Sequence, residues 1–291
     1  MTSRNASFFA DTELVTRIER AESELILSGA EAVRRRNPEG GILTIPIAGG
    51  VAAWAEQDSP LNKVAGLGFA GFPGEGELDA VERAFGDRST PVRVELASLA
   101  DPEVAARLAR RGYLFAGFEN VLGLPLGDWL PSSLPAGVEV VESGPEEFPD
   151  WLEAVVTGFA HPDAQGVPSD EEFPREVLER VMGDLTSAVG FSRYLARRGG
   201  AIAGGASLRM GDGVAQLCGA ATLPAHRRQG VQTALLLARL DLAQAAGCDV
   251  AVVTTQPGSK SQENVQRQGF QLLYTRAVLI RERSAGIDRS R

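Results

Sequence analysis

Two periods of apolar residues along the chain predict two kinds of secondary structure. In residues 11–36, Leu14, Ile18 and Leu25 recur at three- to four-residue spacing or its multiples, which places them on one face of an α-helix. Shorter apolar runs bounded by turn-forming residues predict β-strands. In the first half these strands are expected at about 41–47, 50–55, 63–69 and 92–96.

The second half predicts a longer alternation of strands and helices. Helices are expected at about 146–160, 171–187, 227–246 and 259–268. Strands are expected at about 138–141, 191–197, 200–209, 214–222 and 249–255, and two closing strands at 270–275 and 277–282. This order predicts an α/β protein of the α+β type, with mixed twisted sheets flanked by helices.

An internal repeat indicates that the two halves follow one plan. Ile47-Ala-Gly-Gly50 recurs 155 residues later as Ile202-Ala-Gly-Gly205, and Arg110-Arg-Gly-Tyr113 recurs 157 residues later as Arg267-Gln-Gly-Phe270. The pair Val121-Leu122 and the run 92–96 have counterparts at the second of these offsets, at Val278-Leu279 and 249–253. A period as long as a domain predicts duplication of a single α/β unit.

The segment 127–137 is the expected junction between the two copies. It contains two prolines, two serines and two glycines, which break any regular pattern. A boundary near Pro135 predicts one domain at residues 1–134 and a second at residues 135–291.

Composition narrows the class of protein. The chain has 291 residues, 44% of them hydrophobic, so it can build a sizeable core. Its net charge of −9 argues against a nucleic-acid partner, and the lack of an eighteen-residue apolar stretch argues against a membrane partner. Two cysteines and two histidines, far apart, predict neither a disulfide framework nor a metal site, and we expect a cytoplasmic protein. Its oligomeric state is left open.

One segment, Pro224 to Leu240, suggests a chemistry. It follows an apolar run and leads into an amphipathic pattern, so it predicts a strand, a turn and a helix. Gly230 at the helix start would let the backbone approach a ligand closely, and the unpaired N–H groups of a first helical turn bind anions. Arg227 and Arg228 add charged donors suited to phosphate oxygens, so a pyrophosphate group is the expected ligand.

This arrangement resembles the acyl-CoA loop of the GNAT N-acetyltransferase superfamily, whose pattern is Arg/Gln-x-x-Gly-x-Gly/Ala after a strand and a proline. Here the pattern is Arg227-Arg-Gln-Gly230-Val-Gln232, with Gln232 where the family usually has glycine or alanine. The resemblance implies two tandem GNAT-like domains, with acetyl-CoA as co-substrate in the second. It implies contacts to acetyl-CoA from Leu223, Arg227, Arg228, Gln229, Gly230, Val231, Gln232 and Thr233.

The corresponding segment of the first copy, residues 71–78, departs from the pattern. It carries Glu75 and Glu77 and no arginine, so its carboxylates would repel a pyrophosphate. We therefore interpret the N-terminal copy as a degenerate domain that shapes the protein or its substrate site.

The resemblance also implies direct attack of an amine on a thioester, with a general base and a general acid. The usual acid is a tyrosine four residues before a Gly-Phe pair, and Val265 stands at that position. Tyr274, Ser259 and Asn264 are the candidate catalytic residues, with a core role for Tyr274 and helix capping for Ser259 as the simpler explanations. No glutamate or histidine lies in 214–222, where Gln216 and Cys218 are the reactive-looking side chains.

The expected function is transfer of an acetyl group from acetyl-CoA to a primary amine of a small molecule or peptide. One alternative is a non-catalytic acyl-CoA-binding sensor, which the missing tyrosine and base would suit. Another is an α/β protein that binds some nucleotide, although the chain lacks a Gly-x-x-x-x-Gly-Lys-Ser/Thr loop.

Overall fold

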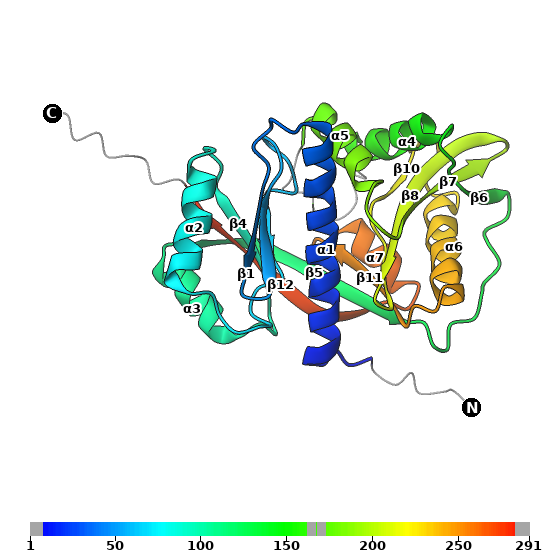
Figure 1. The fold of residues 1–291 in the computed structure, drawn as a ribbon. Coiled ribbons are helices and arrows are strands. Elements are labelled where there is room, and N and C mark those ends of the chain that lie inside the picture. The colour runs from blue at the N-terminus through cyan, green and yellow to red at the C-terminus, as the bar shows by residue number, and fades with distance from the viewer. Residues whose placement is uncertain (1–7, 162–166, 168–172, 283–291) are drawn as a thin grey trace.

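The structure is a computed structural model, and it describes residues 8–161, 167 and 173–282. The described residues form a twelve-stranded sheet with helices packed against it (Figure 1). No helix in the described ranges is long and apolar enough to cross a membrane.

The first half begins with a long helix and continues with short strands. The helix α1 (Thr12–Arg36) starts at Asp11, whose side chain accepts a hydrogen bond from the backbone N–H of Leu14 at 2.9 Å. This helix confirms the one predicted at 11–36. The remaining elements are β1 (Leu43–Ile47), β2 (Gly50–Trp54), β3 (Lys63–Ala65), α2 (Glu75–Gly86), β4 (Val92–Ala97), α3 (Pro102–Arg110) and β5 (Leu114–Pro125).

The second half repeats this order with additional elements: a strand before its first helix, a second helix, one more strand and a short 3-10 turn. Its first elements are β6 (Val138–Glu142), α4 (Phe148–Ala160), α5 (Arg175–Leu185), β7 (Phe191–Arg198) and β8 (Ala201–Gly211). Its remaining elements are β9 (Val214–Gln216), β10 (Ala220–Thr222), the 3-10 turn η1 (Pro224–His226), α6 (Val231–Ala245), β11 (Val250–Thr255), α7 (Lys260–Gln266) and β12 (Gln271–Arg281).

The two halves exchange their last strands. The sheet order is β1-β2-β3-β4-β12-β5-β11-β9-β8-β7-β6, with β10 paired to β8. Thus β12, the last strand of the second half, lies between β4 and β5, and β5, the last strand of the first half, lies between β12 and β11. Each half therefore completes the sheet of the other, and the ribbon shows β5 and β12 crossing the middle of the molecule (Figure 1).

This exchange corrects the prediction of two closing strands at 270–275 and 277–282. The structure has one strand, β12, which bends at two irregularities but continues from Gln271 to Arg281. The position beside β11 that a second closing strand would take is filled by β5. Local patterns of apolar residues carry no information about which strand from elsewhere in the chain will pair, so the sequence did not reveal this arrangement.

The repeat is only partly reproduced. Arg110–Tyr113 and Arg267–Phe270 both connect a short helix to an exchanged strand, so this pair is equivalent in the structure. The Ile-Ala-Gly-Gly pair is not: residues 47–50 form the tight turn between β1 and β2, with positive φ at Ala48 and Gly49, whereas residues 202–205 lie inside β8. Gly204 and Gly205 are small because Ala221 and Trp151 pack closely against them.

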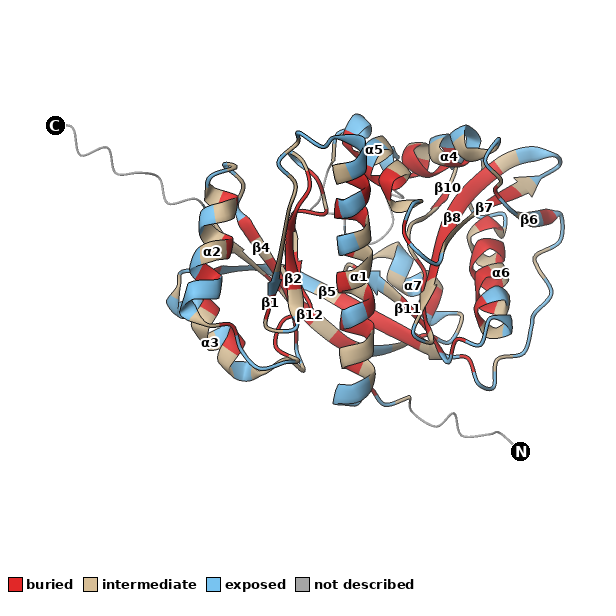
Figure 2. Ribbon diagram, viewed as in Figure 1, coloured by how far each residue is buried: buried red, intermediate tan, exposed pale blue. Residues whose placement is uncertain are grey.

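The helices cover both faces of the sheet. Neighbouring residues of β5 point to opposite faces and so pack against different helices. Val121 packs in the apolar cluster beneath α1, whereas Leu122 packs in the cluster beneath α6. The face that packs on α1 also receives α4 and α5, and the other face receives α2, α3, α6 and α7. Buried residues consequently line the central strands and the inner sides of the helices (Figure 2).

The exchange predicts that the halves cannot fold separately. Residues 135–291 expressed alone would leave β11 and β12 without β5 between them, exposing two unpaired strand edges. We expect this fragment to be insoluble, and coexpression with residues 1–134 to yield a soluble complex of the two fragments. The yield of soluble fragment, measured by size-exclusion chromatography, checks this. A monomeric, cooperatively folded 135–291 fragment would show that the exchange is dispensable.

Candidate functional site

The strand predicted at 214–222 is broken in the structure, and the break opens the sheet. β9 pairs in parallel with β11 only as far as Gln216 and Val252, and the last bond between them runs from Leu217 N–H to the Val252 carbonyl at 2.9 Å. At the break, Ser207 N–H donates to the carbonyls of both Cys218 and Gly219, at 3.2 and 3.0 Å. This is a β-bulge, after which β10 follows β8 and departs from β11.

A buried arginine holds this bulge. The guanidinium of Arg239, on α6, donates to the carbonyls of Ser207 at 2.9 Å, Cys218 at 3.5 Å and Leu235 at 2.9 Å. No carboxylate in the described residues forms an ion pair with it, and burial lowers the pKa of Arg239 to about 10. The side chain therefore stays charged at neutral pH and acts as a multiple donor to the bulge carbonyls.

The gap beyond the bulge has backbone groups on both sides. The Val252 carbonyl accepts a hydrogen bond from Leu217, so the backbone groups of Val252 point away from β5. Residues two apart on a strand point their backbone groups to the same side, so those of Thr254 also point away from β5, toward the gap. On β10, Leu223 N–H bonds to the Ala203 carbonyl of β8, so Ala220 and Thr222 direct their backbone groups to the other side. The gap thus offers the hydrogen-bonding edges that an extended amide chain pairs with.

The loop at the end of this gap has the features that an anion site requires. The turn η1 leads to Arg228 and Gly230, which have φ of 59° and 82°, and α6 then begins at Val231. The first bond within the helix runs from Ala234 N–H to the Gly230 carbonyl, at 2.9 Å. No described residue accepts a backbone hydrogen bond from the N–H groups of residues 228–233, so these donors are available.

The side chains of the loop have different surroundings. Arg227 is tied down by its donation to the Thr222 carbonyl at 3.4 Å and to the His161 carbonyl at the end of α4, whereas Arg228 is exposed. Gln232, the departure from the family pattern, lies 3.5 Å from the Thr222 hydroxyl. Its side chain thus has a partner on β10, which is compatible with a ligand on the backbone donors.

Gly230 has a reason for being glycine that the sequence did not reveal. A Cβ atom there would lie 2.6 Å from the Cβ of Pro135, in addition to the strain of a positive φ. The segment joining the two halves therefore rests directly on this loop. The expectation of a close ligand approach at Gly230 stays a prediction.

The three candidate catalytic residues lie in different surroundings. Ser259 is the N-cap of α7, and its hydroxyl accepts from Gln262 N–H at 3.2 Å. Asn264 is half-buried on the same helix, next to the buried Val265. Near them, at the end of β11, the buried hydroxyl of Thr255 has no hydrogen-bond partner among the described residues.

Tyr274 lies in the core beneath α1. It is 4% exposed, and its hydroxyl donates to the Glu19 carboxylate at 2.6 Å. Burial and the nearby Glu19 carboxylate raise the pKa of Tyr274 well above its usual value. Since β5 separates its strand from β11, we do not include Tyr274 in the proposed catalytic site.

The equivalent loop of the first half is filled by its own side chains. The Glu77 carboxylate accepts from Gly74 N–H at 2.7 Å, at the start of α2. Arg107 and Arg111 pair with Glu75 beside it. The helix start that would receive a phosphate is thus occupied by a carboxylate.

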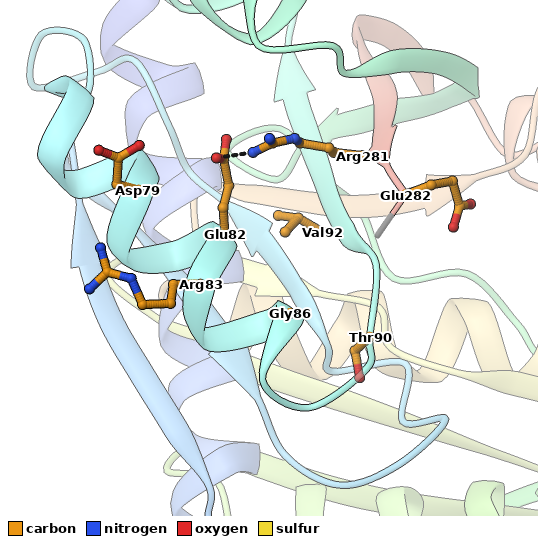
Figure 3. Close-up of a pocket in the computed structure, with 8 residues that line it drawn as sticks. All are labelled: Asp79, Glu82, Arg83, Gly86, Thr90, Val92, Arg281 and Glu282. Atoms are coloured by element: carbon orange, nitrogen blue, oxygen red, sulfur yellow. Dashed lines mark ion pairs between the residues drawn. The ribbon is translucent and has the colours of Figure 1, made fainter. Parts of the chain in front are cut away.

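One open pocket lies outside this region. It measures about 390 Å³ and is formed by α2 and the end of β12 (Figure 3). Glu82 points toward Arg281 there and forms an ion pair with it, and Arg111 also pairs with Glu82. Since Asp79, Glu82 and Arg281 are already paired and the pocket is remote from the gap, we do not assign the chemistry to this pocket.

A cluster of charged side chains lies between α1 and the sheet, and it was not predicted from the sequence. Its members come from α1, β3, β4 and the exchanged strands β5 and β12: Glu19, Glu22, Lys63, Arg93, Glu95, Glu119 and Arg276. A charged residue at an inward position of an apolar strand, such as Glu119, was the available signal. Among the described residues, no group of three or more His, Cys, Asp or Glu side chains is placed to hold a metal ion.

Comparison with known proteins finds one matching family model and several similar structures. Residues 159–270 match the model of the Acetyltransferase (GNAT) family. A GCN5-related N-acetyltransferase from Kribbella flavida has a similar structure, with a TM-score of 0.59 and 20% identity over 87% of this chain and 95% of that one. A tandem GNAT protein from the clavulanic acid biosynthesis pathway, solved without AcCoA, has a TM-score of 0.60 and 16% identity over 95% and 97% of the two chains. A comparison with curated protein sequences finds no match.

Residues 159–270 of the chain therefore match the GNAT acetyltransferase model, and the fold is one shared with a tandem GNAT protein. The predicted fold class is confirmed. The match supports acyl transfer in general, from an acyl-CoA donor to an acceptor.

The acidity of the Cys218 thiol bears on whether the transfer passes through an acyl-cysteine. Burial raises the pKa of the Cys218 thiol to about 12, so the thiolate that an acyl-cysteine requires is scarce at neutral pH. We expect iodoacetamide at pH 8 to alkylate Cys218 at least about 100-fold more slowly in the native than in the urea-unfolded protein, measured by peptide mass spectrometry. Rapid native alkylation, or an acetyl group recovered on Cys218 after mixing with acetyl-CoA, would contradict this.

Proposed function

We propose that this protein is an N-acetyltransferase that transfers an acetyl group from acetyl-CoA to a primary amine of a small molecule or peptide. The observation that carries the proposal is the anion-binding start of α6 at the end of the gap between β10 and β11. A phosphate site joined to an open strand edge suits a ligand with a pyrophosphate at one end and an extended amide arm.

The residues present fit acetyl-CoA. The backbone donors of residues 228–233 and the exposed Arg228 would hold the pyrophosphate, and the backbone groups of Thr254 and Ala220, with the Thr222 N–H, would hold the amides of the arm. Bound acetyl-CoA supplies a reactive thioester. The protein then has to position the acceptor amine and remove its proton.

The proposal keeps the division into residues 1–134 and 135–291, with acetyl-CoA held by the second. In support, Glu77 occupies the helix start in the first half, whereas the helix start in the second half has available donors. A cytoplasmic location and the identity of the contacts from Leu223 to Thr233 remain predictions of the same proposal.

One observation favours the alternative of an acyl-CoA sensor. The position where the family usually has its acid is the buried Val265, and Tyr274 lies in the core. A protein that binds acetyl-CoA without catalysing transfer would have no need of an acid at this position. Release of free CoA therefore separates the two functions.

The loop is tested by placing glutamate at each of two glycines that flank α6. Gly230 and Gly247 both have φ of +82°, at opposite ends of α6, and a Cβ at Gly247 would meet nothing within 4 Å. Gly230→Glu and Gly247→Glu thus introduce the same charge and a similar backbone strain, of about 1–2 kcal/mol, and the side chain at residue 230 must also displace Pro135. By titration calorimetry we expect wild type and Gly247→Glu to bind one acetyl-CoA per chain, and Gly230→Glu to bind at least about 100-fold more weakly, since it places a carboxylate where the pyrophosphate is expected.

Turnover is measured on the same samples as release of free CoA, against a panel of spermidine, tyramine, glucosamine and a lysine-containing peptide. Acceptor-dependent CoA release by the wild type and Gly247→Glu supports the enzyme. Binding without release for any acceptor supports the sensor. Equal binding by Gly230→Glu and wild type would remove the loop from the proposal.

A further inference from the structure

We propose that Glu119, carried by the strand that the first half inserts into the second, is the general base that accepts the proton of the acceptor ammonium. The inference rests on the proposed function. It gives the first half a part in the chemistry, although its own loop is closed.

The strand register brings Glu119 to the gap. On β5, Val121 is paired with Thr254 of β11, and Glu119 lies two residues further along, just past the end of β11 at Thr255. Side chains two residues apart on a strand share a face, so Glu119 and Thr254 both lie on the α1 face. The Arg276 guanidinium connects them, with Nη1 3.4 Å from the Thr254 hydroxyl and 3.7 Å from the Glu119 carboxylate.

This part of the face is reached by solvent. Thr254 is exposed, and the Glu119 side chain is 19% exposed, whereas Glu19 and Glu95 side chains are each 2% exposed. Glu19 accepts from Tyr274 and Arg276, and Glu95 is fixed by Lys63 at 3.0 Å. Glu119 therefore differs from Glu19 and Glu95 in combining partial access with long ion pairs, of 3.5 and 3.7 Å.

The surroundings also give Glu119 a suitable acidity. Burial and the Glu95 carboxylate raise the pKa of Glu119 to about 7, against the opposing effect of neighbouring cations. A base with a pKa near the working pH is the most effective one. The charged groups that face Glu119 are Arg276 on β12, Arg93 and Glu95 on β4, Lys63 on β3 and Glu22 on α1.

Other side chains near the gap suit the task less well. Gln216 cannot accept a proton at neutral pH, and the Cys218 thiol is held protonated by burial. Glu22 is a half-buried carboxylate, but it lies toward β9 and β3, 3.4 Å from the Gln216 amide and 3.8 Å from Lys63. It is the competing candidate that the test has to separate.

The proton balance is simple. The acceptor ammonium gives one proton to the Glu119 carboxylate, and the freed nitrogen lone pair forms the bond to the acyl carbon. The carbon–sulfur bond breaks with its electron pair on sulfur, and the second nitrogen proton moves to that sulfur. The products are the amide, CoA thiol and protonated Glu119, which returns its proton to solvent.

The test compares pH profiles of kcat/KM for CoA release with Glu119→Gln, Glu22→Gln and Glu82→Gln, using the best amine of the panel. A wild type that binds acetyl-CoA but releases CoA to no amine overturns the inference. Glu82→Gln is the matched control. Glu82 is also a half-buried carboxylate paired with arginines, but it lies on α2, on the face of the sheet opposite to Glu119. A base must be ionised, so the wild-type rate should rise through pH 7 and level off above it. Glu119→Gln should lower the rate about 10²- to 10⁴-fold and remove this rise, with unchanged acetyl-CoA binding by calorimetry.

A second readout is independent of turnover. In protein labelled with ¹³C at glutamate carboxyl carbons, one resonance should titrate near pH 7 in the wild type and in Glu82→Gln and be missing from Glu119→Gln. If Glu119→Gln fails to fold, Glu119→Asp replaces it: retention of a pH-dependent rise with a shifted midpoint is expected for this variant alone.

The outcomes separate this inference from the proposed function. If the wild type binds acetyl-CoA and releases CoA, while Glu119→Gln keeps its rate and its pH profile, the inference is overturned and the proposed function stands. Loss of the rise in Glu22→Gln instead assigns the base to Glu22 and also overturns it. Failure of the wild type to bind acetyl-CoA ends both.

Discussion

The exchange of β5 and β12 is the constraint on which the rest of the structure depends. Because each strand is paired on both edges by strands of the other half, neither half has a complete sheet alone. The exchange fixes the register of β5 against β11, and that register decides which side chains of the first half stand beside the gap of the second. A slip of one residue would turn Glu119 to the other face.

The charged cluster beneath α1 follows from this arrangement. Buried charges are tolerated only when they are paired, and the partners here come from α1, β3, β4, β5 and β12, so they meet only after the exchange is complete. Glu19 shows the dependence most clearly: its partners Tyr274 and Arg276 lie more than 250 residues away along the chain. Such contacts favour one register over its alternatives, because a slipped pairing would leave charges buried and unpaired.

Local features of the structure could be predicted from the sequence, and non-local ones could not. The apolar stripe at 11–36 gave α1, and Gly230 with its flanking arginines gave the turn and helix of the second half. The break at 217–219 escaped detection because Leu217 and Cys218 continue an apolar run, and the bulge there is held by Arg239 from a distant turn of α6. The exchange and the charged cluster escaped for the same reason, since pairing between distant segments leaves no periodic trace.

The asymmetry between the halves is itself an argument about the site. A helix start that carries Glu75 and Glu77, with the Glu77 carboxylate bound to the Gly74 N–H, presents negative charge to a phosphate, which supports the proposal that only the second half holds acetyl-CoA. The strands of the first half are nevertheless built into the other sheet, beside the free edge of β11. A copy that does not bind the donor can place a carboxylate near β11, where the other copy has Gln216 and Cys218, on β9 and just after it. The proposed division of labour between the halves would then follow from strand exchange combined with a single open loop.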